Sequence, residues 1–263
     1  MNSTQVNHAS NDKKKYPIIV TISFFIITSL VSFFYHDFWT IFDQDGLIYL
    51  SAGQQILEGN GTNVSLPNSG PAGPILFAIL EMITNNGLFA TKIVSIFSGT
   101  AIVFFSYHVF RNIFDYRIAI LSQLFIAFNP WVGILSISSQ NDLTPISLAI
   151  ISLYFITKNK IKFFDILISA SFLGIAFMFR TQPIIFFLAI IIFIILMKKD
   201  KKFKIIGIAL FIIFFTLLCS PMLFYNLSTH DTILDSNTNY YIAAHSKHST
   251  SEWKNYLFDN INK

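Results

Sequence analysis

Charged residues are scarce in this chain: they make up 12% of its 263 residues, against about 25% in ordinary soluble proteins. Hydrophobic residues make up 53%, and 30 residues are Phe. The apolar blocks are too extended for soluble core helices, so they predict an all-α, polytopic membrane protein. The formal net charge is +4. The basic residues lie in short loops between apolar blocks, which is not the signature of a nucleic-acid-binding protein.

Cysteine is almost absent as well. Cys219 is the only one, and it lies inside an apolar run. A disulfide within the chain is therefore impossible, and a cysteine-based metal site is disfavoured. No internal repeat is evident either, so the inverted-repeat layout of many secondary transporters finds no support.

Seven apolar segments could cross a bilayer, which takes roughly 17–25 residues, or fewer where flanking residues help. They are 17–34, 88–110, 118–135, 143–156, 163–179, 183–197 and 203–224. An eighth run, 75–83, is too short and carries Glu81, so we interpret it as an interfacial or re-entrant helix. We expect an N-terminal segment (1–16), a membrane domain (17–224) with a long first loop (35–87), and a C-terminal tail (225–263).

Lys and Arg are missing between Lys15 and Lys92, and most of them occur in four clusters. The clusters are 13–15, 111–117, 158–162 and 198–204. With seven spans, all four clusters fall on one side of the membrane, which the positive-inside rule makes cytoplasmic. We therefore expect a cell-membrane protein with a cytoplasmic N-terminus, an outer first loop and an outer C-terminal tail.

An acidic triplet, Asp43-Gln44-Asp45, follows the first predicted span. The residues after it, 46–58, offer one broad apolar face and predict a short amphipathic helix on the outer membrane surface. At its start, Asp45 could simply cap the helix. Near lipid headgroups, one carboxylate could instead accept a proton from an attacking hydroxyl, or both could hold a divalent cation such as Mg²⁺ or Mn²⁺.

The order of motifs along the chain resembles the polytopic GT-C glycosyltransferases, which include protein O-mannosyltransferases and aminoarabinose transferases. The matching features are the acidic triplet, Tyr49, Leu57-x-Gly59, the proline-rich step at 71–74, Lys92, Asn129-Pro130, Asn141-Asp142, and Arg180 after the fifth span. With further matches at Arg111, Gly174, Ser220-Pro221 and Asn226, the resemblance covers most of residues 16–245. Gly46 departs from the pattern, because many of these enzymes carry a second acid there. Most are also far longer, so this chain could be a minimal enzyme, a truncated product or a catalytically silent remnant.

The resemblance implies a transferase that takes a sugar from a polyprenyl-phosphate donor, itself a membrane lipid. The acceptor would be a protein, glycan or lipid on the extracytoplasmic face. By the same resemblance, Asp45 is the catalytic base, and Asp43 is its neighbour or a metal ligand. Asp142 would bind substrate or share in a metal site. The other substrate-binding assignments are Arg180 and Lys92, to the lipid phosphate, and Tyr49.

Simpler roles compete with these assignments. Lys92 could snorkel to the interface, and Asp142 could cap a helix. Arg180 at a span end is costly if lipid-exposed, which favours a functional role or a partner such as Asp142. Two other functions also stay open: a non-catalytic binding or assembly subunit of the same fold, and a small transporter. A transporter predicts ionisable groups at mid-membrane, whereas these acids and Arg180 fall at span ends.

Overall fold

A computed structural model describes residues 3–34, 44–59 and 70–230. Asp43 lies outside the described residues. Within them, every element of regular secondary structure is a helix, as the composition predicts. The helices are α1 (Ser3–Phe34), α3 (Gln44–Leu57), α4 (Ala72–Thr84), α5 (Gly87–Ile113), α6 (Tyr116–Ala127), α7 (Pro130–Ile137), α8 (Leu143–Thr157), α9 (Phe163–Phe179), α10 (Ile184–Leu196) and α11 (Lys201–His230).

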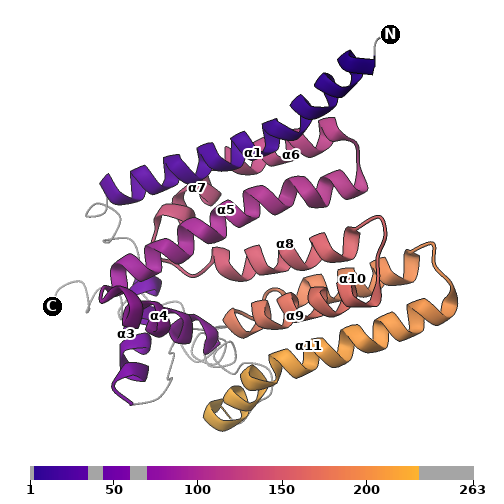
Figure 1. Cartoon of the computed structure of the whole chain (residues 1–263). Helices are drawn as coiled ribbons and strands as arrows, with labels where there is room; N and C mark the ends of the chain where they lie inside the picture. The colour runs from indigo at the N-terminus through magenta and orange to yellow at the C-terminus, as the bar shows by residue number, and fades with distance from the viewer. Residues whose placement is uncertain (1–2, 35–43, 60–69, 231–263) are drawn as a thin grey trace, which may run out of the picture.

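The long helices form rows that run back and forth between two ends of the molecule (Figure 1). The turns α5–α6, α8–α9 and α10–α11 lie at one end. Helices α3 and α4 pack on each other and on α5 at the opposite end. The α7–α8 linker and the end of α9 lie at this same end. The topology thus gathers segments that are far apart in the sequence.

Helix length separates two groups among the predicted spans. Lys15–Phe34, Gly87–Ile113 and Lys201–Phe224 are long and apolar enough to cross a membrane. Helices α8, α9 and α10 have 15, 17 and 13 residues. At about 1.5 Å per residue they fall short of a hydrocarbon core roughly 30 Å thick. The chain is an integral membrane protein by its apolar helices, but the count of seven spans stays a prediction.

The third predicted span, 118–135, is not one straight helix. It divides into α6 and α7, which are bent by 54° relative to each other. Asn129 caps α7 by accepting a hydrogen bond from the Trp131 N–H at 2.9 Å, and Pro130 occupies the first turn. Pro130 has no N–H to continue the hydrogen-bond ladder of α6, so the helix ends and restarts here. The segment 118–135 thus keeps the apolar length of one span, but it is bent at Asn129-Pro130.

Close packing of α9 on α11 fixes the helix that ends beside Arg180. A Cβ built on Gly174 would lie 2.9 Å from the Cβ of Leu218 and 3.0 Å from the carbonyl oxygen of Phe215. Glycine therefore lets the two backbones approach, as small residues do between membrane helices. The Phe177 and Phe215 rings pack beside this contact with centroids 5.9 Å apart. The end of α9 is held firmly in the bundle.

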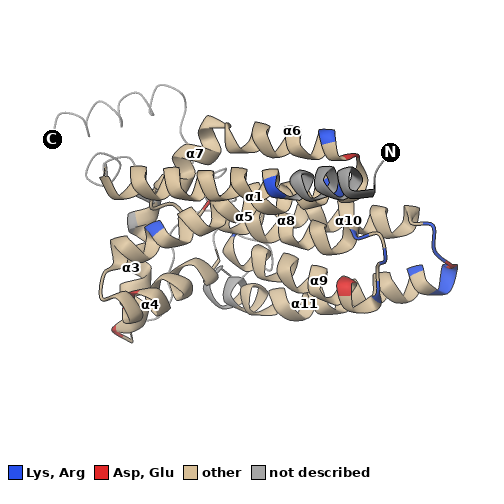
Figure 2. Ribbon diagram, turned by 45° about the horizontal axis from the view of Figure 1, so that its top comes forward, with Lys and Arg blue, Asp and Glu red and all other residues tan. Residues whose placement is uncertain are grey.

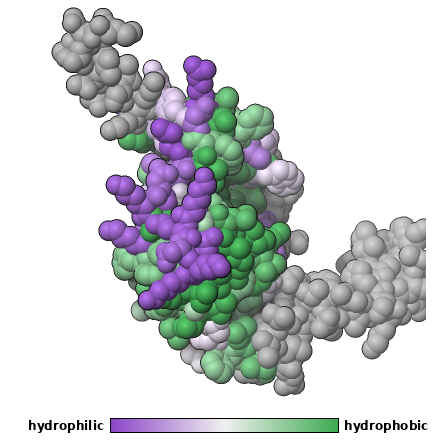
Figure 3. Space-filling view, turned by 90° about the vertical axis from the view of Figure 1, so that its right-hand side faces the viewer, coloured by the Kyte–Doolittle hydropathy of each residue, from purple (hydrophilic) through white to green (hydrophobic). Residues whose placement is uncertain are grey.

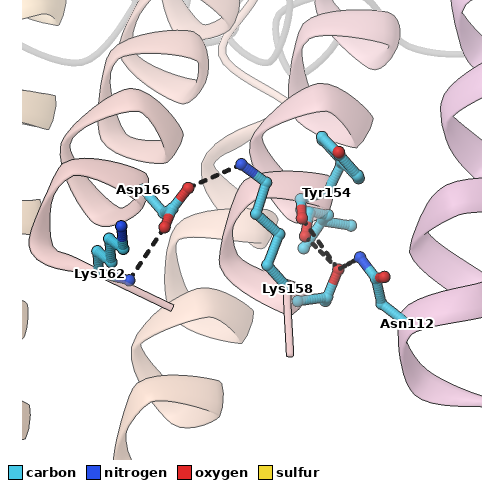
Figure 4. A network of polar contacts seen from close by, with 7 residues as sticks. Asn112, Tyr154, Lys158, Lys162 and Asp165 are labelled. Carbon is cyan, nitrogen blue, oxygen red and sulfur yellow. Dashed lines mark hydrogen bonds and ion pairs between the residues drawn. The ribbon is translucent and has the colours of Figure 1, made fainter. Parts of the chain in front are cut away.

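Lys and Arg residues gather at the end of the bundle that carries the turns (Figure 2), and hydrophilic residues cover much of the surface there (Figure 3). There Lys158 Nζ lies 2.7 Å from Asp165 Oδ1, and the Lys162 N–H donates to Asp165 Oδ2 at 3.0 Å (Figure 4). Asp165 therefore ties the α8–α9 turn to the first turn of α9. The separation of this end from α3 and α4 agrees with the predicted sidedness, while the orientation of the termini in a membrane stays a prediction.

Candidate functional site

The start of α3 is held against the linker between α7 and α8, residues 138–142. Asp45 lies in the first turn of α3, a helix that the sequence placed at 46–58. A Cβ built on the adjacent Gly46 would lie 2.5 Å from the Ser139 carbonyl oxygen, so a side chain at this position would force the backbone to shift. The resembled enzymes often carry a second acid at this position. In this chain the close approach to Ser139 favours glycine there. The contact brings the backbone beside Asp45 to the linker.

Tyr49 lies one turn further along α3 and is fully buried. Its ring meets the edge of Phe77 of α4 with centroids 6.3 Å apart. Gly73, at the start of α4, passes close to this ring, since a Cβ there would lie 3.2 Å from Tyr49 Cδ1. The same Cβ would lie 2.4 Å from Asn141 Nδ2. Tyr49 therefore packs where α3, α4 and the linker meet, and its substrate-binding role stays a prediction.

Asp142 and Arg180 form an ion pair at the other end of the linker. Asp142 Oδ1 lies 2.9 Å from Arg180 Nη2, and the side chains are 27% and 19% exposed. Asp142 occupies the position before α8, but its side chain makes no capping hydrogen bond there. The alternative of a simple cap is therefore wrong, and the predicted partnership of these two residues is confirmed.

The backbone around Arg180 is fixed by a contact from the segment before α4. The Gly70 N–H donates to the Phe179 carbonyl oxygen at 3.1 Å. A Cβ built on Gly70 would clash with the Met178 carbonyl oxygen, so this approach also requires glycine. Arg180 itself follows α9 in an extended conformation. A backbone hydrogen bond thus joins the segment before α4 to the end of α9, next to the ion pair.

Lys92 lies near the start of α5, at the same end of the bundle as α3 and α4. It is 5% exposed, and its Nζ donates to the Ser32 carbonyl oxygen at 3.3 Å, near the end of α1. Ser32 Oγ in turn donates to the Ile137 carbonyl oxygen, just before the linker. Lys92 does not snorkel to the interface, so that alternative is wrong. Its contact with a lipid phosphate stays a prediction.

The linker is also bound by hydroxyl groups of α5. Ser95 Oγ donates to the Gln140 carbonyl oxygen at 2.7 Å, and Ser98 Oγ lies 3.0 Å from Thr144 Oγ1 at the start of α8. Helices α3, α4, α5 and α9 therefore all contact the linker or the first residues of α8. The candidate functional site is the linker, residues 138–142, with the side chains that lie on it.

Asn141 is a residue that the sequence did not single out as a site residue. It is fully buried in the linker. Neither polar atom of its amide makes a hydrogen bond within the part of the chain that the structure describes. The sequence signal is weak: a polar pair, Asn141-Asp142, that opens an apolar helix. Whether an amide is satisfied depends on neighbours that a sequence does not show.

A divalent cation has little to bind among the described residues. No three His, Cys, Asp or Glu side chains of these residues are placed to hold one metal ion. The Asp142 carboxylate contacts a guanidinium, which a cation would have to displace. Asp43, the other predicted ligand, lies outside the described residues. The metal site stays a prediction, and no step below depends on it.

Comparison with known proteins gives one informative match. The family model described as dolichyl-phosphate-mannose-protein mannosyltransferase matches residues 68–225, more than half of the chain. The match begins shortly before α4 and runs into α11, so it includes Lys92, Asp142 and Arg180 but not Asp43, Asp45 or Tyr49. No curated protein and no solved structure matches the chain.

Proposed function

Because the chain belongs to the dolichyl-phosphate-mannose-protein mannosyltransferase family, a family of membrane glycosyltransferases, we propose that it transfers a sugar from a polyprenyl-phosphate donor. The acceptor is a hydroxyl group on the extracytoplasmic side, carried by a protein, glycan or lipid. The strongest structural support is the Asp142–Arg180 pair, which forms on the same linker that the start of α3 contacts. The candidate cation and the helix that carries the candidate base thus contact the same linker.

Asp45 is the proposed general base. An acceptor hydroxyl is a poor nucleophile until a carboxylate takes its proton in the transition state, and such catalysis contributes about 10²- to 10⁴-fold. Asp45 lies in the first turn of α3, where the positive end of the helix dipole favours the carboxylate form. Asp43 is proposed as its neighbour in binding the acceptor.

Arg180 is the proposed contact to the lipid phosphate. When the sugar leaves, the phosphate oxygen gains negative charge, which a fixed guanidinium stabilises. Asp142 fixes the orientation of that guanidinium at 2.9 Å, so less reorganisation is needed in the reaction. Lys92 adds a second positive charge at this end of the bundle, and Tyr49 packs against α4 next to the linker.

The function is tested by sugar transfer in membranes that contain the chain. Radiolabelled mannose, glucose and aminoarabinose on polyprenyl phosphate are supplied separately, with and without a threonine-containing peptide. We expect label to leave at least one of these lipids. If none of the three is consumed, although the protein is folded in the membrane, this function is wrong.

A second candidate is a non-catalytic subunit that binds the lipid-linked sugar. It is favoured by one observation: the family match begins after α3 and gives no support to Asp45 as a base. This alternative predicts binding of the lipid-linked sugar without turnover, or turnover only beside another chain. The same transfer measurement, with donor binding measured in parallel, separates the two.

A further inference from the structure

Asn141 lies in the middle of the candidate site and has 0% of its surface exposed. Its amide carries one N–H₂ group and one carbonyl oxygen, and neither is hydrogen-bonded within the described residues. Burying an amide without partners is unfavourable, and native proteins rarely do so without a reason. Water or a ligand is therefore needed to satisfy this side chain.

The neighbours of Asn141 place it between the two halves of the proposed site. Ser139, two residues before it, contacts the start of α3. Asp142, directly after it, pairs with Arg180. Gly73 leaves room for the amide, because a Cβ there would lie 2.4 Å from Asn141 Nδ2. The amide thus lies between the helix of the proposed base and the proposed phosphate contact.

We propose that Asn141 binds hydroxyl groups of the substrate through both atoms of its amide. This inference rests on the proposed function. An ionised phosphate group accepts hydrogen bonds but donates none. A prenyl chain neither donates nor accepts them. A hydroxyl group both donates and accepts, so sugar hydroxyls can satisfy the Asn141 carbonyl and N–H₂ together. The ligand chemistry is therefore that of hydroxyl groups, from the donor sugar or from the acceptor.

Gln123 offers a matched control, because it is the other fully buried amide side chain among the described residues. Its Nε2 donates to the Pro17 carbonyl oxygen at 2.9 Å and to Thr21 Oγ1 at 3.0 Å. These bonds join α6 to α1 and give Gln123 a structural role, although its Oε1 makes no hydrogen bond among the described residues. Asn141 has no such bonds among the described residues.

The first test compares Asn141→Leu with Gln123→Leu. We expect Asn141→Leu to keep or raise the melting temperature, because it removes an unsatisfied buried amide. Sugar transfer per folded protein should fall by about 10- to 100-fold, as expected for lost substrate hydrogen bonds. Gln123→Leu should lower the melting temperature and leave transfer per folded protein unchanged. If Asn141→Leu lowers the melting temperature and transfers sugar like the wild type, Asn141 is structural and the inference is wrong.

A binding measurement identifies the source of the hydroxyl groups. Polyprenyl-phosphate mannose and sugar-free polyprenyl phosphate are compared for how far they raise the melting temperature of each protein. If the donor sugar is the ligand, the wild type favours the mannose lipid, and Asn141→Leu loses that preference. If the acceptor supplies the hydroxyl, Asn141→Leu keeps the preference for the mannose lipid. Its transfer to the threonine peptide then falls, while its hydrolysis of the donor by water does not change.

The outcomes also separate this inference from the proposed function. If Asp45→Asn abolishes transfer and Asn141→Leu changes neither transfer nor lipid preference, the inference fails and the function stands. If neither lipid stabilises the wild type and no sugar is transferred, both are wrong.

Discussion

Asp142 Oδ1 lies 2.9 Å from Arg180 Nη2 and joins the start of α8 to the end of α9. The two residues are 38 positions apart in the sequence, and both stand at the ends of helices that face α3 and α4. A charge at such a position is costly without a partner. The pair therefore explains how the bundle keeps a guanidinium at the end of an apolar helix.

The first prediction concerns this pair. Arg180→Lys keeps the charge but loses the planar fork of donors. We expect sugar transfer to fall by about 10- to 100-fold, because hydrogen bonds to charged groups contribute about 1.5–3 kcal/mol. Transfer kinetics in membranes measure the effect, with donor concentration varied to separate KM from kcat. Wild-type kinetics in Arg180→Lys would show that the guanidinium does not bind the donor.

The ion pair at the opposite end supplies the control. Lys158 and Asp165 are 2.7 Å apart in the α8–α9 turn. Asp165→Asn should lower the melting temperature, since it weakens both the ion pair and the bond from the Lys162 N–H. Transfer per folded protein should not change. An equal loss of transfer in both variants would mean that Arg180→Lys acts only through stability.

The second prediction concerns the close approach of α4 to the linker. Gly73→Ala places a methyl group 2.4 Å from Asn141 Nδ2 and 3.2 Å from the Tyr49 ring. We expect it to displace the linker and reduce transfer by at least about tenfold, because misplacing reacting groups by an ångström can cost about 100-fold. Gly133→Ala is the control, as its Cβ would meet nothing within 4 Å. Equal activity of the two variants would contradict the proposed site.

The third prediction concerns sidedness, which the basic turns indicate. Cys219 is first replaced by Ala, so that single cysteines can be introduced at Glu58, beside α3, and at Lys160, in the α8–α9 turn. A membrane-impermeant thiol reagent should label Glu58→Cys in intact cells. It should label Lys160→Cys only after the membrane is opened. The reverse pattern would place α3 and the candidate site in the cytoplasm.

Local signals made α3 and α4 predictable from the sequence. Gly59 ends the first and Pro71 precedes the second, so the expected ranges 46–58 and 75–83 lie close to Gln44–Leu57 and Ala72–Thr84. The Asp142–Arg180 pair was also predictable, because opposite charges at the ends of apolar spans favour pairing.

Features that depend on tertiary packing were not predictable in the same way. Proline is tolerated inside many membrane helices, so Asn129-Pro130 alone did not reveal the 54° bend. Lys92 lies on α5, but its burial depends on how α1 packs there. The unsatisfied amide of Asn141 depends on neighbours from α3 and α4. Each of these features arises from contacts between distant segments.

The most direct measurement is sugar transfer by Asp45→Asn beside Glu58→Gln, in membranes with equal amounts of folded protein. Each change removes one carboxylate. Asp45 lies in the first turn of α3, and Glu58 is exposed directly after its last residue. We predict that Asp45→Asn lowers kcat by about 10²- to 10⁴-fold, as loss of a general base does, while Glu58→Gln transfers sugar like the wild type. Wild-type transfer by Asp45→Asn would contradict the proposed mechanism.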